Sequence, residues 1–171
     1  MLIRIDDITD GGLQIKTQKS AGWVTNIPEI VNETKELSLN KDIDIDCIVT
    51  KVLKEICVNG LIQFGIVIQC SRCLKDVDLD LKTDINLTLT PIDEVEDKTG
   101  GNDNEFYEGE SIDLSNYFRE HIAMNIPNKV VCKESCKGLC SKCGIDLNDK
   151  ECSCEKGLGD SAFAVLKGIK L

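Results

Sequence analysis

The chain has 171 residues, which suits one domain or one domain with a small appendage, and 42% of them are hydrophobic. Its formal net charge is −10, which disfavours unaided binding of the protein to phosphate backbones. No run approaches the roughly 18 apolar residues of a membrane span, and the N-terminus lacks the basic and apolar regions of a signal peptide. We therefore expect a cytoplasmic protein without membrane contact.

Residues 43–90 show the hydrophobic pattern of β-strands. Apolar side chains alternate with polar ones from Ile43 to Val49 and again from Val77 to Leu89, close to a period of two. Asn59-Gly60 is a candidate hairpin turn between two such runs. The pattern predicts long antiparallel strands with one buried and one solvated face.

Residues 93–110 hold eight acidic residues and one lysine, with a Gly-Gly pair in the middle. This composition cannot form a core and predicts a mobile loop. The alternative is an acidic docking segment for a basic partner.

A helix is predicted over residues 113–126. Asp113 is a suitable N-cap, and Pro127 ends the segment. One helical face carries Leu114, Tyr117, Phe118, His121 and Ile122. His121 is the single histidine of the chain, and its place on this face favours a packing role over catalysis. No nucleophilic triad is indicated.

The ten cysteines are the strongest chemical signal in the chain. Cys47 and Cys57 lie within strand patterns and are interpreted as small apolar core residues. The other eight contain two C-x2-C knuckles and are predicted to bind structural zinc: Cys70, Cys73, Cys132, Cys136, Cys140, Cys143, Cys152 and Cys154. Cytoplasmic thiols stay reduced, which favours metal over disulfides.

The pairing of these eight cysteines is open, with one or two zinc ions. One scheme, which we favour because no clustered thiol is left over, assigns the first four to one zinc and the last four to another. A second joins the two C-x2-C knuckles around one ion. A third fills only the C-terminal site. Iron–sulfur ligation is a weaker alternative, since paired knuckles with Gly and Lys neighbours favour structural zinc. A redox C-x-x-C is also weaker, since Cys70 and Cys73 lie between strands rather than in a βα unit.

A second short helix is predicted over SAFAVLKGIK, where Asp160 can act as the N-cap. The predicted fold is therefore α+β: an antiparallel β-meander or partly closed barrel with two helices and a zinc-stapled, Cys-rich C-terminal region. Residues 1–127 would form the β-rich body, and residues 128–171 the zinc-binding region with the closing helix.

Charge is distributed unevenly between these two parts. Residues 1–127 carry 12 Lys/Arg against 24 Asp/Glu, whereas residues 128–156 carry six lysines against five acids. The lysines near the cysteines can form a basic edge for nucleic acid, or can offset the negative charge of zinc tetrathiolates: Lys129, Lys133, Lys137 and Lys142.

Several motifs, taken in order, resemble the YceD family. They are Cys70-Ser-Arg-Cys73-Leu74, then Ile112-Asp113-Leu114 opening a helix, then Cys136-Lys-Gly-Leu-Cys140-Ser-Lys-Cys143-Gly144-Ile-Asp-Leu-Asn148, then Cys152-x-Cys154, and finally Asp160 before Phe-Ala-Val-Leu. The resemblance covers roughly residues 40–170. It implies a role in biogenesis of the large ribosomal subunit, through accumulation of its 23S ribosomal RNA.

Closed four-thiolate sites leave no coordination position for water, and no phosphate-binding loop or dinucleotide motif is present. We therefore expect a non-enzymatic factor with no small-molecule substrate, whose partners are large-subunit ribosomal RNA or basic ribosomal proteins. The alternatives are a thiol redox or metal-sensing protein and a direct nucleic-acid-binding zinc protein.

Overall fold

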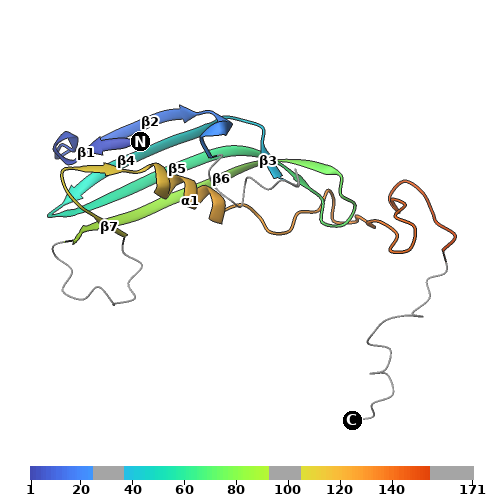
Figure 1. Ribbon diagram of the computed structural model, residues 1–171. Helices are drawn as coiled ribbons and strands as arrows, with labels where there is room; N and C mark the ends of the chain where they lie inside the picture. The colour runs from blue at the N-terminus through green and yellow to red at the C-terminus, as the bar shows by residue number, and fades with distance from the viewer. Residues whose placement is uncertain (25–36, 93–104, 155–171) are drawn as a thin grey trace, which may run out of the picture.

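The computed structural model describes residues 1–24, 37–92 and 105–154, which form an open, mostly antiparallel sheet with an α-helix on one face (Figure 1). The strands are β1 (Leu2–Arg4), β2 (Leu13–Lys19), β3 (Leu37–Leu39), β4 (Ile43–Val52), β5 (Glu55–Gln69), β6 (Asp76–Pro91), β7 (Glu105–Tyr107) and β8 (Ser111–Asp113). The helices are the short 3-10 segments η1 (Ile5–Asp7) and η2 (Ala21–Val24), and α1 (Ser115–Met124).

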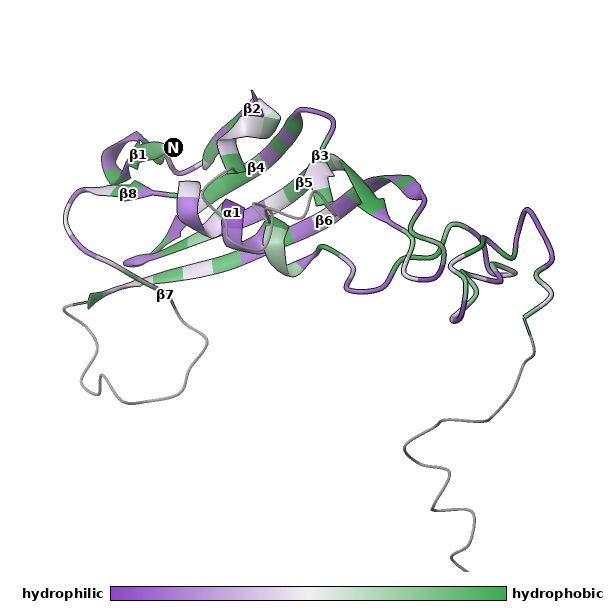
Figure 2. Cartoon of the chain, turned by 45° about the vertical axis from the view of Figure 1, so that its right-hand side comes forward, coloured by the Kyte–Doolittle hydropathy of each residue, from purple (hydrophilic) through white to green (hydrophobic). Residues whose placement is uncertain are grey.

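The main sheet has the order β2-β4-β5-β6-β7, β3 also pairs with β5, and β1 pairs separately with β8. Strands β5 and β6 are antiparallel along most of their length, from Ile56 opposite Leu89 to Gln69 opposite Asp76. Alternating apolar and polar bands run along the strands (Figure 2). This alternation gives the sheet an inner, core-facing side and an outer, solvated side.

The core lies between the inner side of the sheet and α1. Leu114, Phe118 and Ile122 are completely buried against sheet residues such as Ile45 and Ile62. His121 is half-buried, and its Nε2 donates a hydrogen bond to the Asp84 carbonyl oxygen at 2.6 Å. The histidine therefore joins the helix to β6.

The predicted α+β fold, with two helices and a partly closed barrel, is wrong. The sheet is open, with β2 and β7 at the two ends of the strand order, and strands dominate the described residues. Within residues 1–24, 37–92 and 105–154, α1 is the only α-helix. The second helix was expected after Asp160, which lies outside the described residues. No helix in the described part of the chain has the length and apolar character needed to cross a membrane.

The predicted hairpin turn at Asn59-Gly60 is also wrong, because both residues lie inside β5. The turn between β4 and β5 is Leu53-Lys54, since Val52 pairs with Glu55. Gly60 lies opposite Cys47, and a Cβ at Gly60 would be 2.3 Å from the Cys47 Cβ. This glycine therefore permits close approach of two strands rather than a turn.

Two boundaries differ from those predicted. Helix α1 begins at Ser115 and ends at Met124, while Asp113 ends β8 and its Oδ1 accepts a hydrogen bond from the Ser115 backbone N–H at 2.9 Å. Residues Glu105–Tyr107, within the predicted acidic loop, form β7 and pair in parallel with the end of β6. Residues 93–104 of that loop lie outside the described residues.

Candidate metal centres

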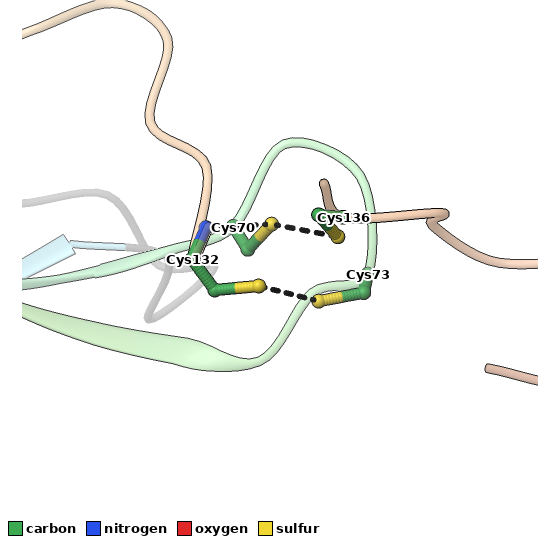
Figure 3. Close-up of side chains that lie close together, drawn as sticks. All are labelled: Cys70, Cys73, Cys132 and Cys136. Carbon is green, nitrogen blue, oxygen red and sulfur yellow. Dashed lines mark hydrogen bonds between the residues drawn. The ribbon is translucent and has the colours of Figure 1, made fainter. Parts of the chain in front are cut away.

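The first C-x2-C knuckle connects β5 to β6. The Leu74 backbone N–H donates to the Cys70 carbonyl oxygen at 2.9 Å, and the Cys70 N–H donates to the Lys75 carbonyl oxygen at 2.8 Å. Leu74 has a φ of 59°, in the left-handed region that a leucine seldom adopts. This turn directs the sulfurs of Cys70 and Cys73 toward a common point (Figure 3).

The second knuckle repeats the same backbone pattern. The Gly144 N–H donates to the Cys140 carbonyl oxygen at 2.8 Å, and the Cys140 N–H donates to the Ile145 carbonyl oxygen at 2.8 Å. Gly144 has a φ of 72° and occupies the position that Leu74 has in the first knuckle. The chain thus contains two turns with the same backbone hydrogen bonds, one on the sheet and one in the C-terminal region.

Cys132 and Cys136 complete a group of four around the first knuckle. The ligand atoms of the four lie within 4.8 Å of one another. The Cys70 and Cys136 sulfurs are 3.9 Å apart, and those of Cys73 and Cys132 are 3.7 Å apart (Figure 3). Cys132 is exposed, whereas the other three are buried. These separations match the edges of a tetrahedron whose centre lies about 2.3 Å from each sulfur, the Zn–S bond length.

Cys140, Cys143, Cys152 and Cys154 form a second group, also with all ligand atoms within 4.8 Å. The second group is more exposed than the first, and Cys143 is its most exposed member. The structure therefore brings the eight predicted cysteines together as two sets of four, in the arrangement of the favoured pairing scheme, and each set can hold a metal ion. Metal binding by these residues stays a prediction, as does the identity of the metal.

Backbone N–H groups converge on particular sulfurs in each group. Burial opposes ionisation of Cys70, but N–H groups of Cys132 and Arg72, 3.4 and 3.5 Å from its sulfur, outweigh that effect and lower its pKa to about 6. The N–H groups of Cys143 and Lys142 lower the pKa of Cys140 to about 6 as well. Each group therefore contains at least one cysteine that ionises readily, and the thiolate is the metal-binding form.

In each group, other thiols have a raised pKa and are harder to ionise. Burial, reinforced by the nearby Cys136 and Cys73 thiols, raises the pKa of Cys132 to about 12. The Cys143 thiol and burial raise the pKa of Cys154 to about 12. Four thiols this close cannot all ionise without a compensating positive charge, and a divalent cation supplies that charge.

Polar contacts connect the two groups. Arg72 of the first knuckle donates through its guanidinium to the carbonyl oxygens of Cys136 and Glu134, at 2.8 and 3.2 Å. Its own carbonyl oxygen accepts from the Leu139 N–H at 3.0 Å, immediately before the second knuckle. Arg72 therefore holds the first knuckle against the segment that leads into the second.

Lys75 makes the second connection. Its Nζ lies 2.8 Å from a carboxylate oxygen of both Asp146 and Asp149, which follow the second knuckle. The contact with Lys75 lowers the pKa of Asp146 to about 2, with help from the Asn148 N–H. The ion pairs are partly exposed to solvent, so each contributes little to stability. Their main effect is to orient the second knuckle against the first.

Asn148 was not predicted to be functional, yet it supports a ligand of the first group. Its Nδ2 donates to the Cys136 sulfur at 3.4 Å, and its Oδ1 accepts from the Lys137 N–H at 2.8 Å. The local signal for it is the spacing of Asp146 and Asn148, because Asp146 Oδ1 accepts from the Asn148 N–H at 2.8 Å, as in an Asx turn.

Replacing Asn148 by alanine is expected to weaken metal binding at the first group by about 10- to 100-fold, the usual cost of losing such a supporting contact. Competition with a coloured chelator measures this change. The matched control is Asn86→Ala, at an exposed position on the outer side of β6. Equal affinities for the two variants would contradict the role given to Asn148.

The remaining candidate residues lie apart from both groups. Cys47 is buried in the core, and burial raises its pKa to about 11. Cys57 is half-buried beside the Thr88 hydroxyl, at 4.0 Å, so it is not the fully buried core residue that we expected. The four lysines of the predicted basic edge are all exposed: Lys129, Lys133, Lys137 and Lys142.

The part of the chain that contains both groups of cysteines is similar to known proteins. A family model described as "Large ribosomal RNA subunit accumulation protein YceD" matches residues 58–170, which include both groups of cysteines. The chain is 24% identical over 170 residues to the chloroplastic "Large ribosomal RNA subunit accumulation protein YCED homolog 1" of Arabidopsis thaliana, covering 82% of this chain and 52% of the relative.

Two further relatives have similar coverage. The homolog 1 protein of Zea mays, with the same description, is 26% identical over 141 residues, covering 66% of this chain and 48% of the relative. An uncharacterized protein of Mycobacterium tuberculosis is 28% identical over 106 residues, covering 61% and 51%. The chain thus spans about half the length of these curated relatives. No solved structure matches it.

Proposed function

This chain belongs to the YceD family, and on that premise we propose that it is a non-enzymatic factor that supports accumulation of large-subunit (23S) ribosomal RNA in the cytoplasm. The observation that carries the proposal is the family match over residues 58–170, which spans most of β5, all of β6 and both groups of cysteines. The cytoplasmic location follows from the site of ribosome assembly.

We further propose that each group of four cysteines holds one structural zinc ion. Cysteine thiolates at tetrahedral spacing are typical of closed zinc sites, which have no open position for water or substrate. The ligands would be Cys70, Cys73, Cys132 and Cys136 for one ion, and Cys140, Cys143, Cys152 and Cys154 for the other. The first zinc ion would attach a C-terminal region, residues 128–171, to the β-rich body of residues 1–127, and the second would hold that region's own fold together.

Charge favours a basic ribosomal protein over RNA as the direct partner. Residues 128–154 contain five lysines against four acids, and each zinc tetrathiolate would carry a net charge of about −2. The lysines would then be offset by the metal centres, so residues 128–154 would not present a basic surface of the kind that binds phosphate backbones. The acidic body instead attracts positively charged protein segments.

Depletion of the protein in cells tests the proposed function. We expect the ratio of large-subunit to small-subunit ribosomal RNA to fall, with a matching loss of free large subunits on a sucrose gradient. A wild-type copy should restore the ratio, whereas a Cys73→Ser copy should not, because the metal-bound region would be lost. An unchanged ratio after depletion would overturn the proposal.

A further inference from the structure

Among the strands that the structure describes, none pairs with the outward backbone edge of the first half of β6, which we call the free edge. One side of β6 pairs with β5, whereas the other pairs only with β7, from Leu89 to Pro91. The Asp84 carbonyl oxygen accepts from His121 at 2.6 Å and therefore points away from β5. Alternate residues of a strand direct their backbone groups to the same edge, so residues 76, 78, 80 and 82 also face outward.

This edge is accessible and long enough to accept another strand. Asp76, Asp78, Asp80 and Lys82 are all exposed, and their outward backbone groups have no backbone partner within residues 1–24, 37–92 and 105–154. The seven residues from Asp76 to Lys82 extend about 23 Å, at 3.3 Å per residue. They lie between the first knuckle and the point where His121 contacts Asp84.

The side chains along this edge have different chemistry on the two faces. On the outer side, Asp76, Asp78 and Asp80 form an acidic row. Asp78 accepts from Asn40 at 2.8 Å and Asp80 pairs with Lys41 at 2.6 Å, which offsets only part of the charge.

On the inner side, the alternate residues are apolar. Val77, Leu79 and Leu81 are only half-buried, at the margin of the core. A strand added here would meet carboxylates on one face and apolar side chains on the other, because side chains alternate in both strands.

We propose that the free edge of β6 binds an extended segment of a partner protein in which basic and apolar residues alternate, by strand addition. Backbone hydrogen bonds would provide affinity, and the two rows of side chains would select the sequence. Strand β2, at the other end of the sheet, carries Lys16 and Lys19 and no acid, so it does not share this preference.

A second copy of the chain is a poorer occupant of this edge. Pairing β6 with β6 would bring aspartates of one copy next to those of the other, and like charges on paired strands are destabilising. Charges on an edge also prevent unselective pairing, so a basic segment is the occupant that the edge admits. The inference that this segment belongs to a basic ribosomal protein rests on the proposed function. The chemistry of the edge is independent of that function.

A direct binding measurement tests the proposal. The full-length, zinc-loaded protein is titrated into a fluorescein-labelled peptide of eight alternating lysine and valine residues, and anisotropy is recorded. A peptide with glutamate in place of lysine is the control. We expect the lysine peptide to bind and the glutamate peptide not to bind.

A pair of variants at Lys82 separates strand addition from simple charge attraction. Lys82→Pro removes an outward N–H without affecting the bonds to β5, as at edge positions where proline is tolerated. Lys82→Thr removes the same positive charge but keeps the N–H. We expect Lys82→Thr to bind the lysine peptide at least as well as wild type, and Lys82→Pro to bind about tenfold more weakly.

Amide hydrogen exchange of the wild-type protein gives an independent readout that needs no substitution. The outward amides of Asp78 and Asp80 should exchange more slowly when the lysine peptide is bound. Any of three results would overturn the proposal. These are equal binding by the two Lys82 variants, unchanged exchange at these amides, and displacement of the peptide by dimerisation of the protein. Peptide binding without a ribosomal RNA defect on depletion would instead overturn the proposed function and leave this site standing.

Discussion

Replacing Cys73 by serine is expected to lower the metal content of the protein from about two ions per chain to one. Cys73 is buried, and its sulfur lies 3.7 Å from that of Cys132. A serine hydroxyl is not a thiolate and leaves three ligands, so the first site would lose its tetrahedral set. Elemental analysis of anaerobically purified protein, with a thiol count beside it, measures the change.

The same substitution should also release residues 128–136 from the sheet. Apparent binding free energies of structural zinc are on the order of 10–16 kcal/mol, which exceeds the stability of many domains. Contacts that keep this segment beside the first knuckle include the Ser71 N–H donating to the Val130 carbonyl oxygen at 2.8 Å. Hydrogen exchange should therefore show loss of protection there, while β4 and β5 remain protected by their own core.

Two further variants complete the experiment. Cys143→Ser should empty the second site and unfold the region around it while leaving the first ion bound, because the first group is more buried and is attached to the sheet. Cys57→Ser is the matched control, since Cys57 lies outside both groups, and it should retain both ions. If Cys73→Ser or Cys143→Ser kept two ions and native stability, the assignment of the metal ligands would be wrong.

Much of the sheet follows from local pattern. The alternation from Ile43 to Val49 and from Val77 to Leu89 is visible because each strand has one buried and one solvated side. The short strand β7 has no such signal, because it has only three residues. It pairs in parallel with the end of β6, from which it is separated in the sequence. Local sequence cannot indicate a pairing of this kind.

In the candidate metal centres, too, the local features are predictable from sequence and the long-range contacts are not. Spacing alone indicates two C-x2-C knuckles, since each is a local turn with one hydrogen-bond pattern. The supporting contacts are not local: Lys75 reaches Asp149, 74 residues away in the chain, and Asn148 reaches the sulfur of Cys136. Polar residues in such positions look like ordinary surface residues until the two knuckles are placed side by side.

Gly60 shows how a residue type can mislead. An Asn-Gly pair is a strong turn signal because glycine adopts positive φ at no steric cost. Gly60 instead lies in β5 opposite Cys47, where the absence of a side chain is what matters. The two explanations predict different results for substitution by alanine, because strain at a turn is local whereas crowding between strands disturbs the sheet.

Replacing Gly60 by alanine is expected to destabilise the protein by about 3 kcal/mol, the upper part of the usual range for overpacking. The new Cβ would lie 2.3 Å from both the Asp46 carbonyl oxygen and the Cys47 Cβ. Backbone atoms cannot move aside as the end of a flexible side chain can, so β4 and β5 would have to separate. Urea denaturation of the metal-loaded protein measures the loss.

Gly11→Ala is the matched control, because its Cβ would find only the Thr9 hydroxyl, at 3.9 Å, and should change stability little. Equal stability of the two variants would mean that β4 and β5 do not pair in this register. The register also matters for the metal centre, because β5 leads directly into Cys70. Gly60→Ala should therefore weaken metal binding at the first group less than replacement of a ligand cysteine does. It should still weaken that binding measurably more than Gly11→Ala does.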